Sequence, residues 1–342
     1  MATNATPNPE LPASAVIANM TTGSWVSQMI GVVAELGIAD LLTDGPRDSD
    51  QLAKSVGANP DALYRLMRAL ASIGIFREVG QRCFQLTPLA DCLRSGVPGS
   101  MRSWARAVIA NHFWCMWQEL LYSVKTGRPA YDHVHGMGLF DYFSRNPETG
   151  KVFDEAMTNF SATEIPAITA GYDFAGIRKL VDVAGGHASL LCAILRVNTT
   201  LEGVLFDMPT VSEGARKVIA AEGLADRCEV VGGDFFQSLP SGGDAYMMKH
   251  IIHDWDDERS IQILKNCRSA MIGDARVLII ETVIQPGNQP DFFKLLDVAM
   301  LTISGRERTE AEFRSLLERA GFRLQRVVPT QSAVSVIEGV AA

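Results

Sequence analysis

One segment of the sequence contains a histidine followed by an aspartate, a pair that is suited to proton transfer. In the segment MKHIIHDW, His253 comes at the end of an expected strand and just before a helix that begins with acidic residues. A histidine there can act as a general base near neutral pH, and the helix N-terminus would favour its neutral form. The alternative is that His253 and Asp254 only cap the helix. His250, earlier on the same expected strand, should face the opposite side and is interpreted as structural.

Two carboxylates could orient this histidine. Glu281 ends the apolar strand expected in VLIIETVI, where a charge without a partner is costly. Glu307 lies in GRERT, ahead of a helix that Thr309 is expected to cap. Either carboxylate could hydrogen-bond to the second ring nitrogen of His253, as a carboxylate does in a hydrolase triad. An exposed loop charge is the alternative interpretation of Glu307.

Residues suited to a nucleotide-like ligand follow three successive expected strands. Gly185 and Gly186 make a turn that lets a ligand approach the backbone. Asp207 ends the next strand about 20 residues later, where an acid can accept both hydroxyls of a ribose. Beyond the third strand, Asp234 could bind the amino group of an adenine while Phe235 stacks on the base. Each feature alone also fits a helix cap or a turn, but together they are more specific.

A parallel sheet would bring these strand ends together. Expected strands and helices alternate over the second half of the chain, which is typical of a doubly wound parallel α/β sheet. The expected strands are 180–184, 203–207, 229–231, 245–251 and 276–282. Two further strands, 323–328 and 333–337, are joined too tightly for a parallel crossover and should form an antiparallel hairpin.

The first half of the chain is expected to be mainly helical. A helix that ends at Val56, a second helix that begins at Pro60, and a hairpin of residues 76–79 and 83–86 make a winged-helix pattern. From about 101 to 169 the sequence is helical and rich in aromatic and methionine side chains, walls that suit an aromatic or polyene-like ligand.

The composition excludes several classes of protein. The 342 residues are 47% hydrophobic and 20% charged, which is ordinary for a globular chain of roughly two domains. A net charge of −8 gives no support to a large nucleic-acid interface. No membrane span or signal peptide is visible. The six cysteines are scattered, so neither a zinc cluster nor a disulfide framework is indicated, and a cytoplasmic protein with reduced cysteines is expected.

Taken together, the motifs resemble those of a known enzyme family. The order of VDVAGGHAS, VLFDMP, GDFF, KHIIHDWDDE, ETVI and GRERTEAEF resembles the S-adenosylmethionine-dependent small-molecule O-methyltransferases. These include plant caffeate and flavonoid enzymes and bacterial enzymes of carotenoid and antibiotic pathways. The resemblance extends over most of the chain.

The resemblance implies a fold, a cofactor and a partner. The fold would be a Rossmann-like class I methyltransferase sheet, mostly parallel with an antiparallel last strand, preceded by a mainly helical winged-helix dimerisation domain. The cofactor would be S-adenosylmethionine without a metal, and the protein would be a homodimer. The expected regions are a disordered arm (1–18), the dimerisation domain (19–100), a helical region at the substrate pocket (101–169) and the cofactor-binding catalytic domain (170–342).

The resemblance also assigns the site residues. The catalytic residues would be His253, Glu281 and Glu307. The cofactor would be held by Gly185, Gly186, Asp207, Asp234, Phe235, Lys249 and Ser161. The substrate pocket would include Met157, Asn111, His112 and Asp254. One departure is that Ala184 replaces a glycine of the usual D-x-G-x-G pattern, and Ala188 stands where another glycine is common. If Ala184 needs a positive φ, alanine costs roughly 1 kcal/mol there.

Three hypotheses about function follow. The first is in-line methyl transfer to a hydroxyl, expected to be phenolic, with His253 as the general base. The second is a homologue that uses the cofactor structurally in a pericyclic or hydroxylating reaction. The third is a winged-helix DNA-binding regulator. Between Arg47 and Arg94, however, seven basic residues stand against five acidic ones, which is a poor balance for binding phosphates.

Overall fold

The computed structural model describes residues 11–342 and divides them into two compact units. One unit contains residues 122–129 and 163–342, and the other contains the remaining described residues. The predicted disordered arm lies outside the described residues up to residue 10. From Ala13 onward the chain is helical, so the prediction of disorder is wrong for residues 13–18.

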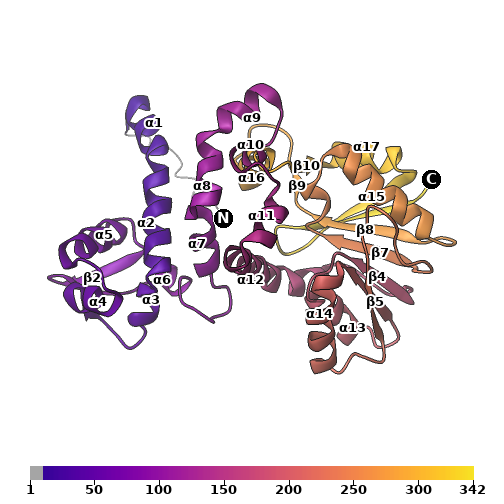
Figure 1. The fold of residues 1–342 in the computed structure, drawn as a ribbon, viewed down its shortest axis with the longest axis horizontal. Coiled ribbons are helices and arrows are strands. Elements are labelled where there is room, and N and C mark those ends of the chain that lie inside the picture. The colour runs from indigo at the N-terminus through magenta and orange to yellow at the C-terminus, as the bar shows by residue number, and fades with distance from the viewer. Residues whose placement is uncertain (1–10) are drawn as a thin grey trace. The chain divides into compact units, whose positions relative to one another are not determined.

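In the described part of the chain, the larger unit is built on a seven-stranded sheet with the order β11–β12–β8–β7–β4–β5–β6 (Figure 1). Its strands are β4 (Lys179–Val183), β5 (Glu202–Asp207), β6 (Cys228–Gly232), β7 (Ala245–Lys249), β8 (Arg276–Glu281), β11 (Phe322–Pro329) and β12 (Ser335–Ala341). Only β12 runs antiparallel to its neighbours β8 and β11 within this sheet. The predicted doubly wound sheet and its C-terminal hairpin are confirmed.

Helices cover both faces of this sheet (Figure 1). They are α13 (Ser189–Val197) and α14 (Pro209–Ala221) on one face, and α15 (Asp257–Ala270) and α17 (Glu310–Arg319) on the other. Because successive strand residues point to opposite faces, Leu180 packs into the core of the first face and Val181 into that of the second. The remaining elements of the unit are η1 (Ile252–Asp254), β9 (Val283–Ile284), α16 (Phe292–Leu301) and β10 (Arg308–Thr309).

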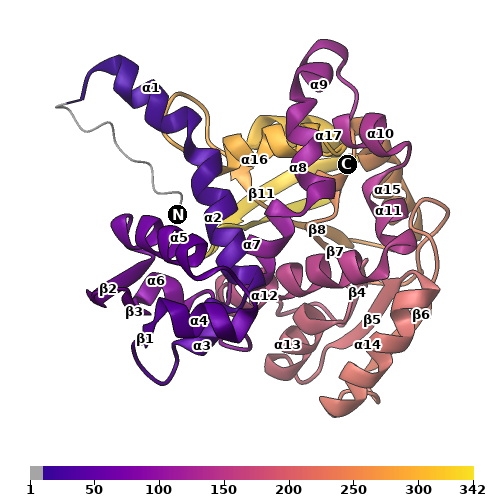
Figure 2. The same ribbon diagram turned by 60° about the vertical axis from the view of Figure 1, so that its left-hand side comes forward.

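The other unit contains a small antiparallel sheet in the order β1–β3–β2, with helices α4 and α5 beside it (Figure 2). Its elements are α1 (Ala13–Thr21), α2 (Gly23–Glu35), α3 (Ile38–Leu41), β1 (Arg47–Asp48), α4 (Ser49–Val56), α5 (Pro60–Ser72), β2 (Phe76–Gly80), β3 (Cys83–Leu86), α6 (Pro88–Asp91), α7 (Arg102–Ile109), α8 (Asn111–Gln118), α10 (Ala130–His135) and α11 (Leu139–Arg145). Helices α9 (Leu120–Thr126) and α12 (Pro147–Gly171) each contribute to both units.

The predicted winged-helix order is present in this unit for a local reason. The side chain of Asn59 accepts hydrogen bonds from the first backbone N–H groups of α5, and Pro60 occupies the first helical position. Leu63, Met67 and Leu70 then bury one face of that helix.

Two details differ from the sequence prediction. Strand β7 ends at Lys249 and not at Ile251, and helix α16 was not expected. The cysteines among the described residues are free thiols. No described helix is both long and apolar enough to cross a bilayer, and the cytoplasmic location stays a prediction.

The strand order determines where a ligand can bind. The chain runs from β4 outward to β5 and β6, and then returns to β7 on the other side of β4. In open α/β sheets, ligands usually bind at the carboxyl ends of the strands beside such a reversal, which here are the ends of β4 and β7.

Candidate active site

The segment after β7 carries two histidines on the same side. His250 has a positive φ of 54°, so the chain leaves the strand geometry immediately after Lys249. The alternation of side chains therefore stops, and the rings of His250 and His253 stack with their centroids 5.1 Å apart. The prediction that His250 faces the opposite side is wrong for this reason.

Two carboxylates flank His253, as the sequence predicted. Its Nδ1 lies 2.9 Å from Oε1 of Glu307 and 3.6 Å from Oε2 of Glu281. Glu281 is fully buried, and its Oε1 accepts hydrogen bonds from the backbone N–H groups of Ile251 and His253. The other ring nitrogen, Nε2, has Asp254 Oδ1 at 3.6 Å, which is beyond hydrogen-bond distance.

The charges at this site reverse one prediction. Burial alone would lower the pKa of His253, but the carboxylates of Glu281, Asp254 and Glu307 outweigh it and raise the pKa to about 10. Burial would likewise raise the pKa of Glu281, but the charge of His253 and the contacts with His250 lower it to about 2. The imidazole of the free protein is therefore protonated at neutral pH, so the predicted preference for its neutral form is wrong.

A further carboxylate, on a distant helix, completes this cluster and was missed by the sequence analysis. Glu164, on α12, is only 7% exposed, and both of its oxygens contact Nε2 of His250 at 3.0 and 3.1 Å. Nζ of Lys249 donates to the same carboxylate at 3.1 Å. The predicted cofactor residue Lys249 is thus tied to α12, the helix that also carries the predicted site residues Met157 and Ser161. These contacts keep the pKa of Glu164 below its usual value despite the opposing effect of burial.

The turn after β4 has the cradle that a bound ligand needs. A side-chain carbon on Gly185 would collide with the carboxylate of Asp182 and with Leu205, so only glycine fits. Asp182 is buried, its Oδ2 has no hydrogen-bond partner, and burial together with the charge of Asp207 raises its pKa to about 7. A buried polar atom without a partner is costly, and a cationic ligand would relieve that cost.

The backbone of this turn is strained at two alanines. Ala184 has a φ of 56° and Ala188 a φ of 64°, the left-handed region that favours glycine. The positive φ that the sequence analysis treated as a condition is therefore present at Ala184. Oδ2 of Asp207 accepts a hydrogen bond of 2.8 Å from the N–H of Gly186 and so joins the turn to the end of β5.

The predicted adenine-binding pair, Asp234 and Phe235, lies after β6. Asp234 is exposed, and its Oδ1 accepts a hydrogen bond from the N–H of Phe236. Phe235 is half-buried, with its ring 4.7 Å from that of Phe236 and 6.2 Å from that of Trp255. Phe235 thus packs on the core next to the histidine segment, and Asp234 remains open to solvent.

Four of the assigned residues belong to the other unit. Asn111 is exposed at the start of α8, whereas His112 is buried and stacks on Tyr142 with ring centroids 5.3 Å apart. Burial, with a smaller effect of His135, lowers the pKa of His112 to about 4, so this histidine is neutral. Met157 and Ser161 lie four residues apart on α12 and so share a face of that helix. Their roles stay predictions.

The histidine cluster could also hold a metal ion. His250, His253 and Glu281 each offer one ligand atom, and these atoms lie within 4.8 Å of one another. Imidazole and carboxylate groups are usual zinc ligands. The expectation of a metal-free site stays a prediction.

Comparison with known proteins decides the family. The model of the O-methyltransferase domain matches residues 117–323, and that of the O-methyltransferase dimerisation domain matches residues 18–96. The chain belongs to the O-methyltransferases. It is 42% identical to a phenazine O-methyltransferase of Lysobacter antibioticus over 96% of both chains. It is 34% identical to a phenazine-1-carboxylate N-methyltransferase of Pseudomonas aeruginosa, over 94% of this chain and 95% of the relative.

Solved structures agree with this assignment. The crystal structure of LaPhzM covers 97% of this O-methyltransferase and all of that chain, with a TM-score of 0.91 and 41% identity. The O-methyltransferase NcsB1, in complex with S-adenosylmethionine and 2-hydroxy-5-methyl naphthoic acid, has a TM-score of 0.82 and 32% identity, with 93% and 96% coverage. S-adenosylmethionine is the cofactor, and O-methylation, the first hypothesis, is confirmed.

Proposed function

We propose that this O-methyltransferase methylates a phenolic hydroxyl of a small aromatic acceptor, with His253 as the general base. The observation that carries the proposal is the pairing of Nδ1 of His253 with Glu307 at 2.9 Å, beside the buried carboxylate of Glu281. This pairing leaves Nε2 available for the acceptor. Glu281 and Glu307 fix the ring and stabilise the imidazolium that forms.

The raised pKa of His253 suits this task. A phenol has a pKa near ~10, and the imidazole in its carboxylate cluster has a pKa of about 10. The neutral form of His253 can therefore take the proton of the acceptor with little difference in free energy, but only the minor fraction of molecules in which the ring is neutral can do so at neutral pH. Asp254, whose own pKa burial raises to about 6, adds a further negative charge beside Nε2.

The turn after β4 and the two strand ends beside it would hold the cofactor. Asp182 and Gly185 offer a buried carboxylate next to open backbone, and Asp207, Asp234 and Phe235 would bind the nucleoside part. When bound, S-adenosylmethionine supplies a methyl group on a positively charged sulfur, which is electrophilic without a metal. Lys249 and Ser161 are proposed to complete the cofactor site.

An aromatic acceptor is supported by the other unit. His112 stands there among aromatic rings, including those of Phe113, Tyr131 and Tyr142. The roles of Asn111, His112 and Met157 of this unit, and of Asp254 beside His253, as acceptor-binding residues remain part of the proposal. The named acceptors of the relatives, a phenazine and a naphthoic acid, are planar aromatic molecules.

A homodimer is the proposed assembly. The dimerisation domain supports it, and so do the exposed apolar side chains of α1 and α2, among them Ile17, Met20 and Trp25. Exposed apolar groups of this size on neighbouring helices are typical of an interface. Light scattering at micromolar concentration should give twice the mass of the chain, and a monomer would argue against the dimer.

Calorimetry with S-adenosylmethionine and S-adenosylhomocysteine is the first test. Binding of both, followed by methylation of an acceptor such as 1,4-dihydroxy-2-naphthoic acid, would support the proposal. The N-methyltransferase among the relatives makes nitrogen the second candidate target. The probe 3-amino-4-hydroxybenzoate carries both groups, and mass spectrometry with fragmentation shows which atom gains the methyl. Methylation of the amino group alone would replace the phenolic proposal.

A further inference from the structure

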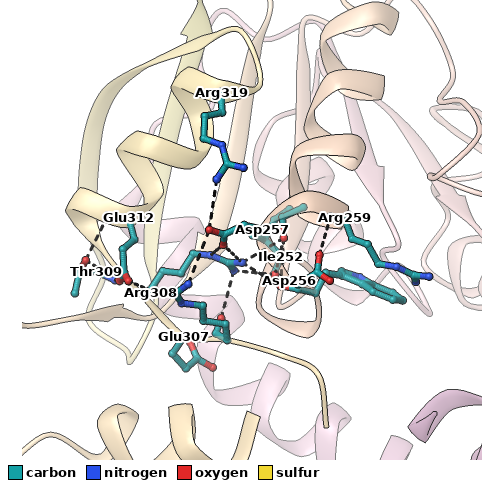
Figure 3. Close-up of polar contacts among 12 residues, drawn as sticks. Ile252, Asp256, Asp257, Arg259, Glu307, Arg308, Thr309, Glu312 and Arg319 are labelled. Carbon is teal, nitrogen blue, oxygen red and sulfur yellow. Dashed lines mark hydrogen bonds and ion pairs between the residues drawn. The ribbon is translucent and has the colours of Figure 1, made fainter. Parts of the chain in front are cut away.

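Arg308 is a buried arginine whose hydrogen-bonding capacity is fully used. Its side chain is about 1% exposed, and the guanidinium has five N–H donors in one plane (Figure 3). Nη1 donates to the backbone carbonyls of Ile252 at 3.1 Å and Arg306 at 3.3 Å. Nη2 donates to the carbonyl of Trp255 at 3.0 Å and to Asp257 at 2.8 Å, and Nε donates to Asp257 at 3.2 Å.

Two of these acceptors bracket the proposed base. Ile252 directly precedes His253, and Trp255 follows it by two residues. One guanidinium therefore holds the backbone on both sides of the histidine. The residue before Arg308 is Glu307, which contacts the ring of the same histidine at Nδ1. The backbone and the ring of His253 are thus held by two adjacent side chains.

The backbones of the two segments are also in direct contact. The N–H of Arg306 donates to the carbonyl oxygen of His253 at 2.7 Å. A side-chain carbon on Gly305 would collide with that same oxygen and with Met300, so glycine is required for the close approach. Arg308 itself pairs with Val283 between β10 and β9, just beyond the strand that ends at Glu281.

We propose that Arg308 is the positioning residue that fixes the histidine turn against the segment carrying Glu307. The inference rests on the proposed role of His253 as the base. Arg308 does not touch the ring, so it acts through the carbonyls of Ile252 and Trp255. Lysine cannot replace it, because a single ammonium on a flexible stem cannot reach acceptors spread around a planar group.

The test compares R308K with the wild-type protein by histidine NMR. Full-length protein labelled with ¹⁵N in histidine reports the titration of each ring, and H253Q identifies the signals of His253. We expect R308K to loosen the contact between Nδ1 and Glu307 and so lower the titration midpoint of His253. The neighbouring charges of Glu281, Asp254 and His250 are unchanged in this variant, so the shift reports the contact. This measurement needs no acceptor.

Kinetics give the second readout. With an acceptor that the wild-type enzyme methylates, starting from 1,4-dihydroxy-2-naphthoic acid, we expect R308K to lower kcat roughly tenfold or more, since small displacements of a catalytic group are costly. Its affinity for S-adenosylhomocysteine should stay within about twofold of wild type, because Arg308 contacts none of the residues proposed for the cofactor.

The matched control is R319A. Arg319 also pairs with Asp257, at 3.6 Å, but it is half exposed and no hydrogen bond joins it to the histidine turn (Figure 3). We expect R319A to leave kcat and the His253 titration unchanged. If R308K does not fold, D257N replaces it, because this change weakens the anchor of Arg308 and keeps an acceptor in place. D257N should then lower both the titration midpoint of His253 and kcat by more than R319A does.

The outcomes are distinct. The positioning role alone would be overturned if R308K had the same His253 titration midpoint and the same kcat as the wild-type protein. If R308K does not fold, equal effects of D257N and R319A would overturn it. An unchanged kcat in H253Q would remove the proposed base, and the positioning role would fall with it. A lowered midpoint and kcat in R308K, with R319A unaffected and cofactor affinity retained, would support the proposal.

Discussion

The turns after β4 and after β7 leave neighbouring strands of the same sheet, and both contain residues other than glycine at positive φ. After β4, Ala184 and Ala188 adopt this conformation and contribute only methyl groups. After β7, His250 adopts it and places an imidazole against Glu164 and next to His253. The same backbone strain thus places only methyl groups at one turn, that of Ala188 packed in the core, and builds a charged cluster at the other.

The difference shows how a strained residue should be interpreted. A left-handed conformation costs roughly 1 kcal/mol for alanine, and in the β4 turn no polar side-chain contact offsets it, since Ala184 and Ala188 have only methyl groups. At His250 the contacts with Glu164 and Glu281 do offset it. Substitutions in the β4 turn should therefore change stability and cofactor affinity, whereas substitutions in the β7 turn should change turnover.

The largest effect is expected at His253. H253Q removes the proposed base, so kcat should fall by roughly 10²-fold or more. Binding of S-adenosylhomocysteine, measured by calorimetry, should stay within a few-fold of wild type. If H253Q turned over at close to the wild-type rate, His253 would not be the general base.

The pH profile sharpens the same assignment. Because carboxylates raise the pKa of His253 to about 10, the neutral imidazole accumulates only as the pH rises, and kcat/KM should increase from pH 7 toward pH 10. E281Q removes one of the negative charges that stabilise the imidazolium. The pKa of His253 should then fall, and the rising limb should move to lower pH. A limb that stays in place or moves to higher pH would contradict this electrostatic account.

In the β4 turn, G185A should act on the cofactor. The added methyl would collide with the carboxylate of Asp182, which must then move within its buried site. We expect affinity for S-adenosylhomocysteine to fall by about tenfold, that is about 1.4 kcal/mol. Calorimetry checks this expectation, with G186A as a comparison, because a methyl group on Gly186 would meet open space at a positive φ of 60°. Unchanged affinity in G185A would show that the cofactor does not bind against the backbone at Gly185.

A184G is expected to have a smaller effect, and to stabilise the protein. Glycine adopts the positive φ without strain, so the free energy of unfolding should rise by roughly 1 kcal/mol despite the greater freedom of the unfolded chain. Urea denaturation measures this change. A loss of stability would mean that contacts of the Ala184 methyl group outweigh its strain. Side-chain contacts would then compensate for backbone strain in both turns.

Removal of metal ions should have no effect. Treatment with a chelator is expected to leave kcat unchanged, because the proposed chemistry needs only proton transfer from the acceptor to His253 and the methyl group of S-adenosylmethionine. A loss of activity that added zinc restores would instead assign a metal to His250, His253 and Glu281.

The fold could be predicted from the sequence where patterns are local. Strands β4 to β8 each contain an apolar run, and β5, β7 and β8 end in a polar residue, so their positions and the residues beyond them were predicted. Helix α16 was missed because its run FFKLLDVAML is apolar on more than one face, and no periodicity marks it as a helix.

The candidate site was predicted only in part, for a physical reason. His253, Glu281 and Glu307 stand in distinctive segments that end at one edge of the sheet. The position of His250 depends on one backbone dihedral angle, and the contacts of Glu164 and Arg308 join segments that are far apart in the chain.

The unpaired carboxylate of Asp182 has a consequence for the heat of cofactor binding. Because burial and the charge of Asp207 raise the pKa of this group to about 7, part of the free molecules hold it protonated at neutral pH. A cationic ligand bound over the β4 turn favours the ionised form, so binding releases that proton to the solvent. The apparent binding enthalpy should therefore vary with the ionisation heat of the buffer, most strongly below pH 7 and hardly at all well above it.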